Sequence, residues 1–579
     1  MNILGISPSW GHDAGAAIVK NGRLVAAAEE ERFTRNKHSY SQSARAYDWC
    51  SNSISFCLRE AGITMDGVDA IAVPWQPALI LKHKFKLRRA FALDFIAKVG
   101  QAIAGGHSRR QALRKQFRKP AGTLELEYFD RYLPVLKPYS NLPEISFIEH
   151  HKAHAATAYY CSGFRDATIV TIDGAGEEEC TVSWSVNENR LVKRKAKKSD
   201  ESLGYFYEMV TAHLNLGRNS EGKTMGLAPY GMPNPELRDK LRKFIDPESG
   251  EWYSGSVQPP YDDLTLMEDA LGFAHRQKAD DATKPPYSGL AFEAQNILEQ
   301  SIVKVVRESV QSTGSGNVCL AGGVALNCST NSILVNSDFT SDFFAFPASN
   351  DGGVPIGAAL ALAADMGEET NFRMEHAYWG PGFSDERVQA VLKSCGLRFE
   401  IVGDSPGTAA ELIAAGKVIG WFQGRMEIGP RALGNRSILA DPTRADVWER
   451  VNVVKNRELW RPLAPSLLYE AKGEYLEKPH ESPFMILAFQ VPEGKRKEIP
   501  AVVHVDGSTR PQTVKREVNE PYWKLIKSLE SINGTPVVLN TSFNVGHEPI
   551  VCTPQDAIRT FYSSPIDALV IGNCVLKKS

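Results

Sequence analysis

The sequence predicts an α/β protein with a duplicated core in its N-terminal part and a second α/β domain after it. A unit of strand, loop, strand, turn and strand occurs twice, at residues 2–28 and again at residues 167–195. The composition changes at residues 365–382, which are polar and punctuated by Gly and Pro. We therefore place the domains at residues 1–370 and 371–579, because a chain of 579 residues is too long for one core.

Each repeated unit joins its first two strands by a loop that contains Gly. In the first unit the expected strands are residues 2–7, 16–19 and 23–28, with a hairpin turn at Asn21-Gly22. In the second unit the expected strands are residues 167–172, 180–186 and 191–195. Two such halves would aim their loops at one cleft, where backbone N–H groups can meet phosphates. Gly174 and Gly176 are therefore predicted to bind a nucleotide.

The remaining segments continue the α/β pattern. Residues 290–310 carry apolar side chains at helical spacing and predict a long amphipathic helix. The other elements expected in the first domain are strands at residues 317–321 and 343–347 and a helix at residues 354–365. A Gly turn after the first of these strands would pass close to a base or ribose, which makes Gly322, Gly323 and Asn327 predicted nucleotide contacts. In the second domain we expect a new α/β unit from residues 384–393 and strands near residues 418–423, 536–539 and 568–571.

Composition excludes several classes of protein. Hydrophobic residues make up 43% and charged residues 23%, as in ordinary globular proteins, and a net charge of −2 points to no particular partner. The N-terminal residues do not read as a signal peptide, and apolar stretches such as residues 358–364 are too short to span a bilayer. Nine cysteines without a CxxC pair argue against zinc knuckles and a disulfide framework. We therefore expect a cytoplasmic protein with no membrane span.

One segment departs from this even charge. Residues 79–119 contain twelve Lys or Arg and one acidic residue, with apolar residues between them. This pattern predicts a basic amphipathic helical insert. Base rates favour a solvated helix pair packed on the domain, and the other interpretation is a patch that recruits an acidic acceptor, a partner or a membrane surface.

The Ala-rich segment around residues 149–156 predicts a metal site. In a helix, His150 and His154 lie four residues apart on one face, where two imidazoles can share a metal, whereas His151 points elsewhere. Spacing alone leaves a chance HxxxH open, but Asp173 ends a predicted strand, where α/β sheets place ligands. Asp351, before the last helix of the first domain, is a fourth candidate ligand, with a helix cap as the alternative. Two His with carboxylates suit Fe(II), Mn(II) or Zn(II).

Three further residues of the first domain are candidates with plainer alternatives. His12, in the loop at residues 8–15, would act as a general base or cap the turn. Lys37 follows the acidic residues 29–31, so a surface ion pair is its alternative. Lys223 lies in a Gly-spaced loop that resembles a phosphate loop loosely.

The second domain concentrates cations in Gly-rich turns. Arg431 lies in GRMEIGPRALGNRS, Lys455 and Arg461 lie in VKNRELWRP, and Arg510 lies in HVDGSTRPQ. Asn540 and Ser542 lie in LNTSFNVG. Arg binds phosphate and carboxylate in a bidentate manner, and Gly lets the backbone approach the ligand. Scattered surface arginines are the alternative, which the Gly and Pro context disfavours.

The segments HHxxHA, GKTMGLAPYG, LAGGVALN, NDGG, GRMEIGPRALGNRS, WRPLAPS and LNTSFN occur in one order along nearly the whole chain. Together they resemble the O-carbamoyltransferase family of nodulation proteins and antibiotic (cephamycin, ansamycin, tobramycin) carbamoyltransferases. The resemblance implies an N-terminal actin/hexokinase-like (Kae1-like) domain and a C-terminal YrdC-like domain. The second domain would form carbamoyl-adenylate from carbamoyl phosphate and ATP with Mg, and the first would transfer the carbamoyl group to a hydroxyl of a small-molecule acceptor.

The resemblance also implies roles for single residues. His150, His154, Asp173 and Asp351 would bind the metal, with Fe(II) expected and Mn or Zn as alternatives. His12 and Lys37 would flank the transfer centre. The residues expected to bind carbamoyl phosphate or the adenylate are Arg431, Lys455, Arg461, Arg510, Asn540 and Ser542.

Other functions remain open at this point. Carbamoylation of a tRNA or another macromolecule would use the basic insert as its footprint, although we expect no nucleic-acid partner for the leading hypothesis. The hydrogenase-maturation version normally carries zinc-finger cysteines, which this chain lacks. A nucleotide-binding regulator of actin-like fold would have no need of the arginine-rich second domain. A homodimer is compatible with the sequence.

Overall fold

The computed structural model describes residues 1–8, 13–39, 50–77, 79, 134–136, 138–139, 141–245, 264–546 and 548–578. The candidate base His12 and nearly all of the basic insert at residues 79–119 lie outside the described residues. Within them, no helix is long and apolar enough to cross a membrane.

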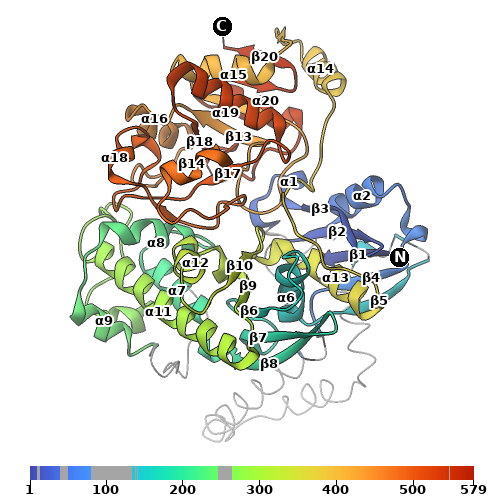
Figure 1. The fold of residues 1–579 in the computed structure, drawn as a ribbon, viewed down its shortest axis with the longest axis vertical. Helices are drawn as coiled ribbons and strands as arrows, with labels where there is room; N and C mark the ends of the chain where they lie inside the picture. The colour runs from blue at the N-terminus through green and yellow to red at the C-terminus, as the bar shows by residue number, and fades with distance from the viewer. Residues whose placement is uncertain are drawn as a thin grey trace, which may run out of the picture.

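The first domain is built on two five-stranded sheets with the same topology (Figure 1). In the first sheet, strands β2 and β3 run antiparallel beside β1, and β4 and β5 continue parallel on its other side. Its strands are β1 (Asn2–Ser7), β2 (Gly15–Lys20), β3 (Arg23–Glu29), β4 (Ala70–Val73) and β5 (Glu144–Phe147). Asn21 and Gly22 have positive φ angles of 49° and 72°, as the predicted hairpin turn requires.

The second sheet repeats the first strand for strand. Strand β6 occupies the place of β1, with β7 and β8 antiparallel on one side and β9 and β10 parallel on the other. Its strands are β6 (Thr168–Ile172), β7 (Glu179–Asn187), β8 (Arg190–Lys198), β9 (Asn317–Ala321) and β10 (Asp342–Ala345). The shared strand order confirms the α/β fold with the predicted duplicated core.

Two helices fill the space between the sheets. Helix α13 (Val354–Asp365) packs on β1 and β2 and against α6 (His150–Tyr160). The contacts are made through Gly, since a Cβ on Gly5 would lie 1.9 Å from the Pro355 carbonyl oxygen, and one on Gly357 would lie 1.9 Å from that of Ala153. The N-terminus of α6 therefore has a fixed position relative to the ends of both sheets. Helices α7 (Leu203–His213) and α11 (Tyr287–Thr313) pack together beside the second sheet.

The C-terminal part forms a separate mixed sheet of eight strands in the order β11-β20-β19-β12-β13-β18-β14-β17. Its strands are β11 (Glu400–Ile401), β12 (Ile419–Phe422), β13 (Arg436–Ala440), β14 (Ala464–Leu468), β17 (Gln512–Val514), β18 (Val537–Ser542), β19 (Ala568–Ile571) and β20 (Cys574–Lys577). Helices α15 (Ser405–Ala414) and α19 (Glu520–Asn533) pack on each other and against this sheet. This is the second α/β unit that the sequence predicts, while the boundary at residue 370 stays a prediction.

A short segment of the first domain reaches into the second (Figure 1). It comprises α1 (Glu31–Thr34) and the 3-10 turn η1 (Lys37–Ser39). The buried Arg32 donates to the Gly429 carbonyl at 2.8 Å, and Arg35 donates to the carbonyls of Pro549 and Ile550, both at 2.6 Å. Lys37 thus lies where the two domains meet.

Candidate functional site

The structure brings the four predicted metal ligands together at the ends of α6, β6 and the loop before α13. Ligand atoms of His150, His154, Asp173 and Asp351 all lie within 4.8 Å of one another. The His154 Nε2 atom is 3.0 Å from Asp173 Oδ2 and 3.5 Å from Asp351 Oδ1. Ligands bound at about 2.0–2.1 Å around a tetrahedral metal lie about 3.3 Å apart, so these spacings fit a metal ion.

The surroundings of His150 leave its Nε2 atom for the metal. Its Nδ1 lies 3.3 Å from the Pro74 carbonyl, which accepts a hydrogen bond from that nitrogen, and its ring stacks on Trp75 with the ring centres 4.0 Å apart. Such outer contacts fix the tautomer and orientation of a ligand imidazole. His151 points elsewhere, as predicted, because its ring bonds Thr171 Oγ1 at 2.8 Å and the Glu179 carbonyl at 2.9 Å.

The four side chains also carry complementary charge. Burial alone would lower the pKa of His154, but hydrogen bonds from its ring to Asp173 and Asp351 outweigh burial and raise that pKa to about 9. Burial opposes ionisation of Asp173, yet hydrogen bonds from His150 and His154 hold the pKa of its carboxyl well below the usual range. The two Nε2 atoms are only 3.1 Å apart, a distance at which two protonated rings would repel each other. A divalent cation between them removes that conflict.

Glu177 positions the ligand helix and was missed by the sequence analysis. Helix α6 has no side-chain cap of its own. The Glu177 carboxylate, 6% exposed, accepts instead from the His150 N–H at 3.0 Å and from the Gln76 N–H at 2.8 Å. A carboxylate at a helix N-terminus is favoured by the helix dipole. The sequence offers no signal for this contact beyond the acidic run EEE that contains it.

Replacement of Glu177 by alanine is expected to weaken metal binding about tenfold, because it leaves the first turn of α6 without its acceptor. Titration with Mn(II) measures the effect. The matched control is Glu177→Gln, which keeps one acceptor oxygen and should stay closer to the unaltered chain. An unchanged Mn(II) affinity in Glu177→Ala would show that the carboxylate does not position the ligands.

The Gly loops that are predicted to meet a nucleotide surround Asp173. The N–H groups of Gly174 and Gly323 donate to Asp173 Oδ1 at 2.8 and 3.3 Å. Gly176 donates to the Glu179 carbonyl at 2.6 Å. Gly322 has a φ of 89°, and a Cβ there would lie 2.2 Å from the Ile172 carbonyl oxygen, so Gly is needed to bring this turn against the end of β6. These four glycines shape the loops around Asp173, and their contacts with a nucleotide stay a prediction.

Asn327 has a local structural role. Its Oδ1 caps helix α12 (Cys328–Val335) by accepting from the Thr330 N–H at 3.1 Å, and its Nδ2 donates to Gln295 at 3.0 Å. Asn is a preferred N-cap residue. The side chain is 7% exposed, and its contact with a nucleotide stays a prediction.

Lys223 likewise contacts protein. Residues 217–224 spell G-x-x-x-x-G-K-T, a closer match to the phosphate-loop pattern than the loose resemblance stated above. A phosphate loop follows a strand, however, and this segment follows α7 and continues into helix α8 (Glu221–Leu227). The Lys223 ammonium pairs with Glu458 of the second domain at 2.9 Å.

The predicted arginines of the second domain gather into a half-buried cluster of cations. Burial, together with the charges of the neighbouring Arg510 and Arg461, lowers the pKa of Arg431 and Arg457 to about 9. Burial also lowers the pKa of Arg461 and Arg510. The Nε atoms of Arg431 and Arg510 are buried without a hydrogen-bond partner, and no described carboxylate pairs with either group. We call Arg431, Arg457, Arg461 and Arg510 the arginine cluster.

Lys455 and the end of strand β18 lie beside this cluster. The buried Lys455 ammonium donates to the carbonyl and hydroxyl of Ser542 and, at 2.7 and 2.6 Å, to the carbonyl and Oδ1 of Asn544. Burial, Arg457, Arg461 and Lys37 all lower its pKa. Asn540 donates to the Ala432 carbonyl at 3.1 Å, while its Oδ1 is buried without a partner. Lys455 therefore holds the turn of Ser542, with its protons already engaged.

Two further residues that the sequence analysis did not single out hold the Arg431 loop in place. The Glu427 carboxylate, 1% exposed, accepts from the N–H groups of Leu433 at 2.7 Å and Asn435 at 2.8 Å. The fully buried Arg436 guanidinium lies over the Phe422 ring at 3.7 Å and donates to the carbonyls of Gln423 and Pro381. Both residues lie in the segment GRMEIGPRALGNRS. Their closeness to Arg431 in the sequence is the one signal that could have indicated their role.

Lys37 lies between the metal ligands and the arginine cluster. The Lys37 side chain is accessible to solvent but has protein around much of it. Desolvation is the main cause that lowers the pKa of Lys37, the charges of Arg461 and Lys223 lower it as well, and the charge of Glu31 raises it. Its neighbour His38 bonds Asp13 at 2.8 Å, and Asp13 accepts from Asn350, beside Asp351, at 2.8 Å. Lys37 is therefore connected to the candidate metal ligands through its neighbour His38 and Asp13, and to the arginine cluster through the charge of Arg461.

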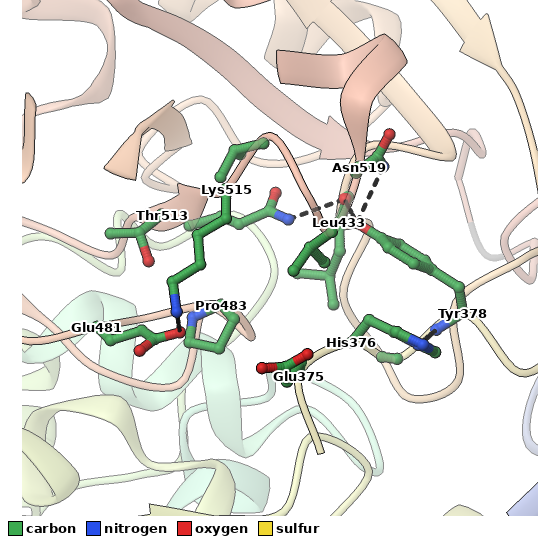
Figure 2. A pocket seen from close by; sticks show the side chains of 13 residues that line it. Glu375, His376, Tyr378, Leu433, Glu481, Pro483, Thr513, Lys515 and Asn519 are labelled. Atoms are coloured by element: carbon green, nitrogen blue, oxygen red, sulfur yellow. Dashed lines mark hydrogen bonds and ion pairs between the residues drawn. The ribbon is translucent and has the colours of Figure 1, made fainter. Parts of the chain in front are cut away.

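A separate small pocket lies between the segment Glu375–Tyr378 and the second domain (Figure 2). Tyr378 and Gln512 both donate to the Leu433 carbonyl at 2.8 Å on its wall. Lys515 pairs with Glu481 across it at 2.6 Å. Its described lining includes none of the predicted site residues, and the pairing of its charges points to no ligand.

Two family models match the chain. A carbamoyltransferase N-terminus model covers residues 2–360, and a carbamoyltransferase C-terminus model covers residues 410–578. The nodulation protein NolNO of Sinorhizobium fredii (strain NBRC 101917 / NGR234) is 37% identical over 588 residues, which cover 100% of this chain and 80% of that protein. A 3'-hydroxymethylcephem-O-carbamoyltransferase of Amycolatopsis lactamdurans is 33% identical over 277 residues, or 48% of this chain and 51% of that enzyme.

Similarity to solved structures is lower. A ROK hexokinase from Thermus thermophilus is 14% identical with a TM-score of 0.27, covering 62% of this chain and 98% of that one. HypF from T. kodakarensis is 12% identical with a TM-score of 0.32, covering 63% and 48%. No functional argument follows from scores of this size. The two family models and the full-length similarity to NolNO show that the chain belongs to the carbamoyltransferase family.

Proposed function

We propose that the chain is an ATP-dependent O-carbamoyltransferase with two sites. The second domain forms carbamoyl-adenylate from carbamoyl phosphate and ATP with Mg. The first domain transfers the carbamoyl group to a hydroxyl of a small-molecule acceptor. We assign carbamoyl transfer to residues 1–370, as a Kae1-like domain, and carbamoyl activation to residues 371–579, as a YrdC-like domain.

The observation that carries this proposal is the arginine cluster. A buried cation without a partner is costly, and its cost is offset when an anion binds. The free Nε atoms of Arg431 and Arg510 supply donors in the fork geometry that suits a phosphoryl group. Carbamoyl phosphate and the phosphates of ATP are anions of this kind. The Ser542 turn and the unpartnered Asn540 oxygen lie beside the cluster, where they would contact the carbamoyl amide.

The proposed reaction balances as two steps, activation and transfer, of which the first consists of two reactions. In the activation step, water cleaves carbamoyl phosphate to carbamate and phosphate, and a carbamate oxygen then joins the α-phosphorus of ATP with release of pyrophosphate. In the second step the acceptor hydroxyl oxygen joins the carbamoyl carbon, and the bond from that carbon to AMP breaks. Adenylation is needed because carbamate itself is a poor electrophile. The arginine cluster would stabilise charge in the first step.

The second step is assigned to the residues around Asp173. His150, His154, Asp173 and Asp351 would hold Fe(II), with Mn or Zn as alternatives, and such an ion supplies Lewis-acid stabilisation of phosphate charge. Lys37 would bring a cation to the same phosphate. A neutral His accepts the hydroxyl proton in this chemistry, a role that we assign to His12. A hydroxyl acceptor agrees with the hydroxymethyl group in the name of the Amycolatopsis relative.

The test is nucleotide turnover by the purified chain. We expect AMP, and not ADP, to form from ATP only when carbamoyl phosphate is present. Release of ADP without carbamoyl phosphate would contradict the proposal. A screen of hydroxylated metabolites with ATP, carbamoyl phosphate and Fe(II), followed by product mass, then identifies the acceptor through a mass increase of one carbamoyl group.

A further inference from the structure

One carboxylate joins the first domain to the arginine cluster. Glu458 Oε1 lies 2.9 Å from the Lys223 ammonium of α8, and Glu458 Oε2 lies 3.9 Å from the Arg461 guanidinium. Burial would raise the pKa of Glu458, but the hydrogen bond from Lys223 and the charge of Arg461 lower it, so the carboxylate is ionised at neutral pH. Glu458 is thus shared between a residue of the first domain and a candidate phosphate ligand of the second.

Helix α8 and the turn that follows it (Ala228–Tyr230) contact the second domain at other points. The His504 ring donates to the Gly226 carbonyl of α8 at 2.9 Å, and the Tyr230 hydroxyl of the turn donates to the carbonyl of Trp460, near Glu458, at 3.0 Å. A Cβ on Gly226 would lie only 3.3 Å from Pro462 Cδ, so α8 is in close contact with the loop at residues 455–462. A shift of this loop therefore has to move α8.

The same helix continues the connection toward the metal ligands. The buried hydroxyls of Thr224 in α8 and Thr211 in α7 bond at 2.8 Å. At the start of α7, Ser202 donates to the Gly174 carbonyl at 2.6 Å, and a Cβ on Gly204 would lie 2.8 Å from the Gly174 nitrogen. An unbroken series of packed elements thus runs from Glu458 to the loop of Asp173.

We propose that Lys223 and Glu458 are positioning residues that couple anion binding in the arginine cluster to the position of α8 and α7. The proposal rests on the phosphate-binding role proposed above for Arg461. A phosphate on Arg461 competes with Glu458 for the guanidinium, which leaves the carboxylate to Lys223 and draws α8 toward the second domain. Coupling between sites is reciprocal, so losing Lys223 lets Glu458 compete more strongly and weakens phosphate binding. Activation in one domain thereby arranges the transfer site in the other.

The test is a double-mutant cycle on the full chain, with inorganic phosphate as the probe and calorimetry as the measurement. In the otherwise unaltered chain, Lys223→Met should raise the phosphate dissociation constant about fivefold or more. In the Glu458→Gln background the same substitution should change it less than about twofold, because the shared carboxylate is gone. Mere loss of a nearby positive charge would instead weaken binding by the same factor in both backgrounds. The matched control is Lys240→Met, since Lys240 pairs with Glu236 inside the first domain and should leave phosphate binding unchanged.

Hydrogen exchange gives a second readout that does not depend on catalysis. Phosphate should slow amide exchange in α8 and α7 of the unaltered chain, and this response should disappear in Lys223→Met and in Glu458→Gln. Equal factors in the two arms of the cycle, or a response that survives in both variants, would overturn the coupling alone. If the unaltered chain binds phosphate no more tightly than Arg510→Ala does, the phosphate role of the cluster is wrong, and the coupling is overturned with it.

Discussion

Replacing Arg510 by alanine is expected to lower carbamoyl-phosphate-dependent AMP formation about 100- to 1,000-fold, the usual effect of removing one preorganised donor from a transition-state site. Arg510 is half-buried, its Nε atom is buried without a partner, and desolvation lowers its pKa. No described carboxylate is lost with this cation. The thermal midpoint of the ligand-free variant should therefore stay the same or rise, which separates a binding role from a structural one.

The comparison for Arg510→Ala is Arg516→Ala. Arg516 lies in the same domain but on the surface, where it pairs with Glu520 at 3.0 Å, and exposed pairs of this type contribute little. AMP yield, followed by chromatography with saturating ATP, should be unaffected in that control. An unchanged yield in Arg510→Ala itself would refute the role assigned to this residue.

Replacing both His150 and His154 by alanine is expected to reduce bound metal about 100-fold or more, since even residues that only orient a ligand typically matter 10- to 100-fold. Carbamoyl transfer should fall with the metal content. AMP formation should persist, because the activation step is assigned to the other domain. Elemental analysis of the purified variant and the AMP assay measure the two effects separately.

The control for this pair is His151→Gln. His151 lies on the same helix but bonds Thr171 and Glu179, so its loss removes a buried contact without removing a ligand. Metal retained in full by the double alanine variant would show that the four-ligand cluster is not the metal site. Metal lost in His151→Gln as well would point to collapse of the helix rather than to ligation.

The sequence predicted those parts of the fold that depend on local pattern. The Asn21-Gly22 turn, the strands on either side of it and helix α13 follow from residue types within a few positions of each other. Three of the candidate metal ligands could be chosen for the same reason, because His150 and His154 are one helical turn apart and Asp173 directly follows a strand. The ion pair of Lys223 and the helix cap of Asn327 could not be predicted from the sequence. Glycine-rich segments that make such contacts within a protein can have the same sequence pattern as those that bind phosphate.

Contacts between distant segments could not be predicted in this way. Glu177 caps a helix that begins 27 positions before it in the chain, and Glu458 meets a lysine 235 positions away. In each case the carboxylate accepts a hydrogen bond from a donor that tertiary packing brings close to it. A local sequence pattern contains no information about such a contact. The buried Nε atoms of Arg431 and Arg510, which have no hydrogen-bond partner, could likewise be recognised only from the structure.

The anchoring of Arg35 to the carbonyls of Pro549 and Ile550 has a consequence for how such chains can recombine. Lys37 follows two positions later, so its location is dictated by the C-terminal half although it is encoded near the start of the gene. A chimera that joins the first half of one relative to the second half of another would separate this lysine from the surface that orients it. A hybrid keeps the junction intact only if residues 31–39 are exchanged together with the segments that they contact, around Gly429 and at residues 549–556.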